Sequence, residues 1–216
     1  MKFKDWIINE RRRQYNSNNV IVVDIQPEYA NGIRFDIGEF SDFLCQMLER
    51  GKRVLYFHNG PDLGMSNADQ IKQYLLNYDE EEMYDYDDEY DDYATKPEVE
   101  EKMYALNNIT FYDKGYGFFR GWMDSGIDES IIIRAVREMI MRRVNDSREL
   151  PEEVLEDLGV DGMSDDINLP HIDIGQLRQF SGAFLCGGGV NECLREVQLL
   201  MSALNIRTTV MSQFTF

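Results

Sequence analysis

Cysteine and histidine are scarce in this 216-residue chain. Its three cysteines, Cys45, Cys186 and Cys193, are a low and odd number, which does not indicate a disulfide framework. With only two histidines, His58 and His171, and no C-x-x-C pair, the chain has no spacing typical of a structural zinc site. We therefore expect no resident metal and no cofactor.

The sequence also has little positive charge and no long apolar run. Lys and Arg number 22 against 40 Asp and Glu, which argues against nucleic-acid binding because phosphate contacts need a basic surface. No apolar run approaches the length of a membrane span. Residues 1–18 have the pattern of an amphipathic helix with a basic end, not of a signal peptide. We expect a cytoplasmic protein with no membrane partner.

Enough apolar residues are present for an ordinary hydrophobic core, at 43% of the chain. Short β-branched runs alternate with segments of helical periodicity, which predicts an α/β protein. We expect a three-layer α/β/α sandwich with a mostly parallel, doubly wound sheet, in a single domain over residues 1–216. Strands are predicted at 20–23, 52–60, 109–115, 181–189 and 206–214, and helices at 39–49, 67–76 and 191–204.

Polar residues follow several of the predicted strands. Asp24, His58, Lys114 and the glycine-rich turn at 187–193 each stand at a strand end. Ligands of open parallel sheets bind at the carboxyl ends of the strands, so these positions indicate a site.

The glycine-rich turn lies within "FLCGGGVNECLREV", residues 184–197. A strand, three glycines and a helix start would point backbone N–H groups at one spot, where they favour a thiolate on Cys193 and stabilise an oxyanion. This pattern is typical of a nucleophile built on cysteine. The alternative is a buried structural cysteine beside a tight glycine turn.

Three motifs together resemble the isochorismatase-like cysteine hydrolases, which include nicotinamidases, N-carbamoyl amide hydrolases and isochorismatases. "VVDIQPEY" is similar to the family's D-x-Q-x-x-F, "DKGYGFF" to its K-x-x-x-x-F, and "GGGVNECL" to its G-x-x-x-x-x-C-[VL]. The resemblance covers roughly residues 18–78, 106–124 and 180–213, in an isochorismatase-like hydrolase fold.

The resemblance implies a catalytic triad of Asp24, Lys114 and Cys193 acting through a thioester. Asp24 would move the thiol proton, and Lys114 would hold the two anionic groups in place. The N–H groups of Gly189 and Cys193 would form the oxyanion hole, beside a cis peptide bond between Gly188 and Gly189. The expected reaction is hydrolysis of a C–N bond in a small amide or carbamoyl substrate.

Four further residues are candidates for a substrate pocket: Gln26, Tyr29, Phe119 and Trp122. Less specific interpretations remain open. Asp24 can cap a loop, Lys114 can be a surface lysine in a turn, and aromatic residues at this density more often belong to a core or an interface.

The sequence departs from the family at two places. Nicotinamidases bind a metal through D-x-H and a further histidine, whereas "YFHNGPDLGM" offers only His58 and Asp62, so we expect a metal-independent hydrolase rather than a nicotinamidase. The usual Thr-Asp before the cysteine is replaced by residues 190–192. A catalytically retired binding or scaffold protein is therefore the alternative.

Two insertions interrupt the expected framework. One, at about 79–102, holds thirteen acidic and two basic residues. Its D-x-D spacing suits calcium, but an EF-hand register starting at Asp85 places Tyr90 where glycine is required. We favour the interpretation of this insertion as a solvated, mobile loop. The alternatives are a docking site for a basic partner, DNA mimicry, a lid and an intersubunit arm.

The second insertion, at about 126–173, is predicted to be helical. It holds helices at 128–144 and 147–159, the latter with Ser147 as N-cap and Gly159 as its end. Members of the family form dimers or larger assemblies, so we expect a homo-oligomer that uses this insertion as a contact surface.

Overall fold

Five parallel strands form the central sheet of this protein in the computed structural model. The structure describes residues 19–77, 84–87, 92–115, 117–163, 167–169 and 174–216, so the helix predicted at 1–18 lies outside the described residues. The strands are β1 Val20–Val23, β2 Val54–His58, β5 Thr110–Asp113, β6 Ala183–Gly187 and β7 Thr208–Val210. Their spatial order is β5-β2-β1-β6-β7, and every pair is parallel. The predicted α/β class with a doubly wound parallel sheet is confirmed.

The order of the strands places a topological switch point between β1 and β6. Chain connections move outward from β1 through β2 to β5 on one side, and from β6 to β7 on the other. Val20 of β1 lies opposite both Val54 of β2 and Phe184 of β6. In sheets of this kind a crevice for ligands opens at the carboxyl ends of the two strands that flank the switch point.

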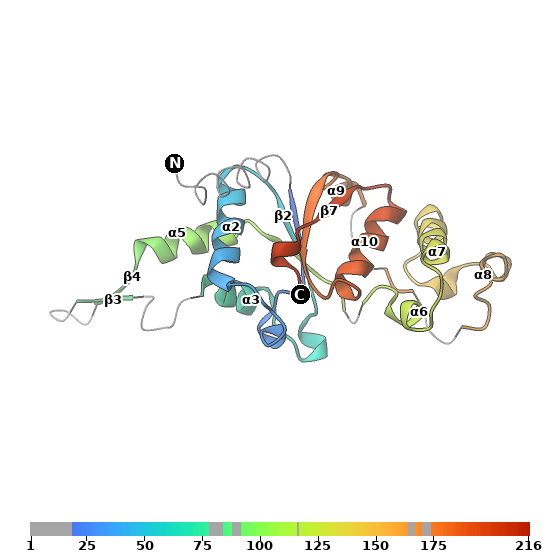
Figure 1. Ribbon diagram of the computed structural model, residues 1–216, viewed down its shortest axis with the longest axis horizontal. Helices are drawn as coiled ribbons and strands as arrows, with labels where there is room; N and C mark the ends of the chain where they lie inside the picture. The colour runs from blue at the N-terminus through green and yellow to red at the C-terminus, as the bar shows by residue number, and fades with distance from the viewer. Residues whose placement is uncertain (1–18, 78–83, 88–91, 116, 164–166, 170–173) are drawn as a thin grey trace.

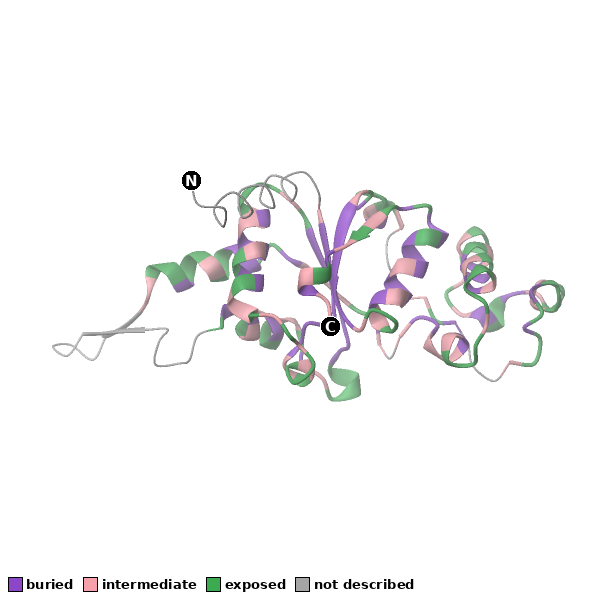
Figure 2. Ribbon diagram, viewed as in Figure 1, coloured by how far each residue is buried: buried purple, intermediate pink, exposed green. Residues whose placement is uncertain are grey.

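Side chains of the central strands alternate between two apolar layers, as expected for a sheet covered on both faces. Val20 and Val22 pack with helices α2 (Ile37–Glu49), α3 (Ala68–Leu76) and α5 (Pro97–Leu106). Ile21 and Val23 pack toward α9 (Ile174–Arg178) and α10 (Cys193–Ala203). Figure 1 shows the two groups of helices on opposite sides of the sheet, and Figure 2 shows the buried strands between them.

The helical insertion packs outside α10. Helix α7 (Glu129–Arg142) contacts α10 through an ion pair between Glu129 and Arg195, and Arg137 Nε donates to the carbonyl of Ala203 at 3.0 Å. Helix α6 (Arg120–Asp124) and helix α8 (Glu152–Leu158) lie on the same side of the sheet (Figure 1). The predicted helix at 128–144 is confirmed.

The helix predicted at 147–159 is interrupted at Pro151. A 3-10 turn, η3 (Ser147–Glu149), precedes α8, which ends at Gly159 as predicted. Ser147 as N-cap is wrong, because its buried hydroxyl instead accepts from the backbone N–H of Ile167 at 2.9 Å. Asp146 caps the 3-10 turn in its place.

The acidic insertion is more ordered than predicted. It contains an antiparallel pair, β3 (Tyr84–Asp87) and β4 (Asp92–Thr95), and the beginning of α5. Proline at the first position of α5 suits a helix start, and Val99 is fully buried. Lys102 of α5 pairs with Asp42 of α2 at 3.0 Å. The interpretation of the whole tract as a solvated loop is therefore wrong for these parts.

Among the described residues, no helix combines the length and the hydropathy that crossing a membrane requires.

Candidate active site

Asp24 stands where β1 ends, in a backbone conformation that is rare for residues other than glycine. Its φ is 50°, and its N–H donates to the carbonyl of Phe57 at 2.9 Å. The residue is 1% exposed. Strained conformations of this kind are concentrated at functional sites, although aspartate tolerates them better than most residues.

Lys114 follows β5 and reaches across β2 toward the end of β1. Its backbone N–H donates to the carbonyl of His58 at 2.8 Å, and its Nζ lies 3.0 Å from Asp24 Oδ2. The side chain of Lys114 is 0% exposed and that of Asp24 is 2% exposed. Lys114 is thus not a surface lysine, and the pairing offsets the large penalty of burying either charge alone.

Asn59, which follows β2, was missed as a site residue because it reads as part of a turn in the sequence. Its Oδ1 accepts from Lys114 Nζ at 2.8 Å, and its Nδ2 donates to the hydroxyl of Tyr29 at 2.6 Å. The side-chain amide of Gln26 bonds both backbone groups of Asn59, at 2.9 and 3.0 Å. Gln26 is fully buried and fixes Asn59, and its contact with a substrate stays a prediction.

Cys193 is the first residue of α10, at the end of the glycine turn that follows β6. The turn is tight because Gly187, at φ 84°, leaves no room for a side chain: an added Cβ would lie 2.1 Å from the carbonyl oxygen of Val23. This close approach brings Cys193 beside the end of β1, where its thiol interacts with the carboxylate of Asp24. The structure therefore brings Asp24, Lys114 and Cys193 together at the switch point.

The glycine turn contains no cis peptide bond, so the bond between Gly188 and Gly189 is trans and that prediction is wrong. Gly187 and Gly188 reverse the chain instead, both at positive φ. Phe216 braces the turn, since its N–H donates to Gly188 at 3.3 Å and its carbonyl accepts from Val190 at 3.2 Å. The N–H groups of Gly189 and Cys193 have no backbone acceptor in the described part of the chain.

Burial dominates the electrostatics of the three groups. It raises the pKa of Asp24, although the charge of Lys114 opposes the change. Burial and the charge of Asp24 raise the pKa of Cys193 to about 12, so the lowered pKa expected from the sequence is wrong. For Lys114, burial acts to lower the pKa, but the charges of Asp24 and Cys193 outweigh it and the pKa is raised. The resting site is a neutral thiol beside an ion pair.

The predicted pocket aromatics separate into two environments. Phe119 and Trp122 are 0% and 1% exposed and belong to the apolar core on the α10 side, which agrees with the alternative that they are core residues. Their contact with a substrate stays a prediction. They anchor the chain that follows Lys114. Tyr29, in the 3-10 turn η1 (Pro27–Tyr29), is half-buried. Burial and the charge of Asp24 raise the pKa of Tyr29, which keeps its hydroxyl neutral.

The described residues contain no group of three or more His, Cys, Asp or Glu side chains arranged to hold a metal ion. The ring of His58 packs edge-on against Phe111 at 5.9 Å between centroids, and its Nδ1 lies 3.3 Å from the carbonyl oxygen of Asn59. His58 therefore packs and hydrogen-bonds at the end of β2.

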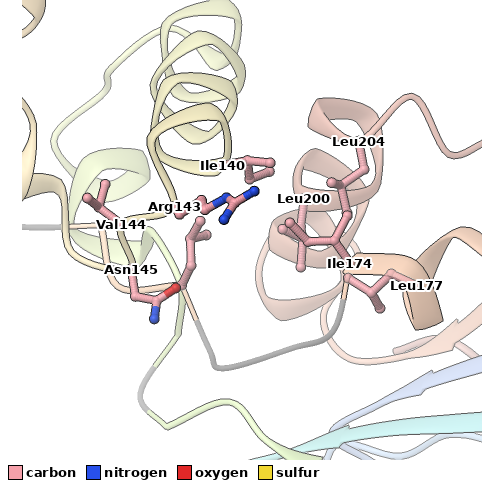
Figure 3. Close-up of a pocket in the computed structure, with 9 residues that line it drawn as sticks. Ile140, Arg143, Val144, Asn145, Ile174, Leu177, Leu200 and Leu204 are labelled. Carbon is pink, nitrogen blue, oxygen red and sulfur yellow. The ribbon is translucent and has the colours of Figure 1, made fainter.

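An apolar hollow of about 200 Å³ lies away from these residues, between the ends of α7, α9 and α10. Ile140, Leu177, Leu200 and Leu204 are among its lining side chains. Figure 3 shows Ile140 on one side of the hollow and the three leucines on the other. None of its lining residues belongs to the cluster around Cys193.

Comparison of the chain with protein-family models, with curated proteins and with solved structures found no match. The interpretation of the site therefore depends on its own geometry and on the three motifs.

Proposed function

We propose that this protein is a cysteine hydrolase that cleaves the C–N bond of a small amide or carbamoyl compound through a thioester. One observation carries the proposal: the Asp24–Lys114 ion pair is buried at the switch point of a parallel sheet, and the charges of both residues act on the thiol of Cys193. A thiol, a base and a fixed cation are the groups that acyl transfer through cysteine requires.

The raised pKa of Asp24 suits it to act as the base. A carboxylate whose proton affinity is closer to that of the thiol takes the proton of Cys193 more readily as the sulfur attacks the carbonyl carbon. The proton then passes from Asp24 to the departing amine, which leaves a thioester on Cys193. Asp24 next accepts a proton from water while the oxygen of that water attacks the thioester carbon. The acid leaves, and Asp24 returns the proton to the sulfur of Cys193, which restores the thiol and the carboxylate.

Lys114 keeps the local charge balanced in this sequence of steps. Its ammonium faces Asp24 when the carboxylate is ionised, and it faces the thiolate when Asp24 carries the proton. Asn59 holds the ammonium in place throughout. The N–H groups of Gly189 and Cys193 are available to the oxyanion of the tetrahedral intermediate.

The proposed substrate class follows from what the site offers. Hydrolysis by thiol, carboxylate and ammonium needs no metal, and the sequence lacks the D-x-H motif that nicotinamidases use to hold the pyridine nitrogen through a metal. We infer a metal-independent enzyme that acts on a non-peptide amide or carbamoyl group. We further infer a homo-oligomer, with contacts through the helical insertion, where Met141 of α7 is 68% exposed.

A second candidate function, a retired binding or scaffold protein, is favoured by the thiol itself. With a pKa raised to about 12, Cys193 holds its proton at rest, as an inert structural cysteine also does.

Release of ammonia or amine from a panel of small amides and carbamoyl compounds separates the two functions. Cys193→Ser should abolish turnover, and mass spectrometry of the wild type during turnover should show an acyl adduct on Cys193. Cys45→Ser is the matched control, because Cys45 is buried on the opposite face of the sheet and should leave turnover unchanged. Failure of every substrate, with no adduct from an activated ester, would favour the scaffold.

A further inference from the structure

Glu196 is a second buried carboxylate close to the candidate triad. It lies one helical turn after Cys193 on α10 and is 1% exposed. Its Oε1 accepts from the backbone N–H of Phe119 at 3.1 Å, whereas its Oε2 has no hydrogen-bond partner among the described residues. Because an unsatisfied buried carboxylate is costly, its presence beside a reactive group calls for a role.

The chain after Lys114 is shaped around this carboxylate. Gly117 has a φ of 135°, and a Cβ added there would lie 2.8 and 2.9 Å from the two oxygens of Glu196. Glycine at this position therefore makes room for the side chain of Glu196. Two residues later, Phe119 donates its N–H to the same carboxylate, so Glu196 joins the segment 117–119 to the helix that carries Cys193.

Charged groups from three other elements lie around Glu196. Lys114 after β5, Arg120 of α6 and Asp24 after β1 act on it, and it acts in turn on Cys193. Burial raises the pKa of Glu196, against the Phe119 N–H and the cations, which lower it. Two further charged or titratable residues lie near these groups. The exposed carboxylate of Glu192 is 3.8 Å from Arg120, and His58 acts to lower the pKa of Asp24.

We propose that Glu196 is a positioning residue of this site, which fixes the segment after Lys114 against α10 and adds a second negative charge beside Lys114 and Cys193. The buried ammonium of Lys114 then acts electrostatically on two carboxylates, Asp24 and Glu196, and on the thiol of Cys193. The charge on Glu196 opposes formation of the thiolate, so it keeps Cys193 protonated until Asp24 takes the proton. This role rests on the proposed function in treating Cys193 as the reactive thiol and Asp24 as its base.

The test is the pH dependence of Cys193 alkylation by iodoacetamide in the intact protein, with Cys193→Ser to subtract the other cysteines. Glu196→Gln keeps the size of the side chain and an oxygen that accepts from Phe119, but it removes the charge. It should lower the pKa of Cys193 by about one unit and make alkylation at a fixed pH about three- to tenfold faster. Glu192→Gln is the matched control, since an exposed charge near the same helix end is screened and should shift the pKa by less than ~0.3 unit.

Glu196→Ala separates positioning from charge. It should lower the pKa of Cys193 as Gln does and should also lower the melting temperature, because the N–H of Phe119 loses its acceptor. Equal thiol pKa values in wild type, Glu196→Gln and Glu192→Gln would overturn the proposal.

Alkylation needs no substrate, so the two proposals fail separately. A shifted thiol pKa in a protein that hydrolyses no amide supports the role of Glu196 and counts against the hydrolase. An unshifted thiol pKa in a protein that hydrolyses amides supports the hydrolase and overturns the role of Glu196.

Discussion

The carboxylate of Asp24 and the ammonium of Lys114 lie 3.0 Å apart, although they follow strands that are not neighbours in the sheet. Asp24 follows β1 and Lys114 follows β5, with β2 between them. Asn59, at the end of β2, fills the gap and bonds the ammonium at 2.8 Å. The ion pair is thus held by residues at three strand ends. The charge of Asp24 raises the pKa of the Cys193 thiol, whereas the charge of Lys114 lowers it.

Removing the charge of Asp24 and removing the charge of Lys114 should shift the pKa of Cys193 in opposite directions. Asp24→Asn removes a negative charge and should lower the thiol pKa, whereas Lys114→Met removes a positive charge and should raise it, each by about one unit or more. The pH profile of alkylation measures both, with circular dichroism to verify the fold. A shift of the same sign in both variants would contradict the arrangement. Both variants should lose amide hydrolysis.

Asn59→Ala should weaken both stability and activity. Lys114 and Tyr29 each lose a buried hydrogen-bond partner, which should lower the free energy of unfolding by about 1–3 kcal/mol. Urea denaturation gives this value, and turnover should fall because the ammonium is no longer held. Asn108→Ala is the control, at an exposed asparagine before β5, at the opposite ends of the strands. Within the described residues its side chain bonds only carbonyls of the preceding helix, so turnover should not change and the loss of stability should be smaller than at Asn59. Equal effects at the two positions would show that Asn59 has no special role.

Gly187→Ala should be far more damaging than Gly182→Ala. The two glycines have almost the same φ, 84° and 80°, so backbone strain is matched. An added Cβ meets the carbonyl of Val23 at 2.1 Å at position 187 and nothing within 4 Å at position 182. We expect a loss of about 1–2 kcal/mol at Gly182 from the conformation alone, and more than about 3 kcal/mol at Gly187. Thermal and urea melts compare them, and similar losses would refute the close approach of β1 and β6.

The stability of the protein should fall in alkaline solution, in part through Cys193. Burial and Asp24 raise the pKa of Cys193 from 9.0 to about 12, so the folded state keeps a proton that the unfolded state releases. This contribution is complete below pH ~9 and is lost as the pH rises toward about 12. Urea midpoints at pH 8 and pH 10.5 should therefore differ less in Cys193→Ser than in wild type. An equal difference in both would mean that the thiol titrates normally.

The framework of the fold was predictable because strong local patterns specify it. The run at 20–23 is entirely apolar and becomes β1, which is buried on both faces, and the periodic segment at 191–204 becomes α10. Helix α5 was missed since it begins inside an acidic tract with a weak apolar stripe. The split at Pro151 was missed because the apolar period continues across it.

The site was predictable to the extent that each residue stands at a strand end. Asp24, Lys114 and Cys193 lie close together because the carboxyl ends of all the parallel strands are on the same side of the sheet. Sequence could not separate Phe119 and Trp122 from pocket residues, since an aromatic side chain looks the same in a core and in a cleft. Glu196 gave no signal, because a single acidic residue in a helix normally faces water and only the packing shows that it is buried.

The position of β1 in the sheet also affects how the chain acquires its structure. Ile21 of β1 and Cys186 of β6 touch, yet they are 165 positions apart in the chain. The side of β1 that pairs with β6 must therefore remain unpaired until the residues between the two strands, and β6 itself, have left the ribosome. Contacts of such long range slow folding, and an open apolar edge invites pairing with other chains. The feature that assembles the site would also make the half-made protein prone to aggregation, and its yield in a cell sensitive to temperature and to chaperones.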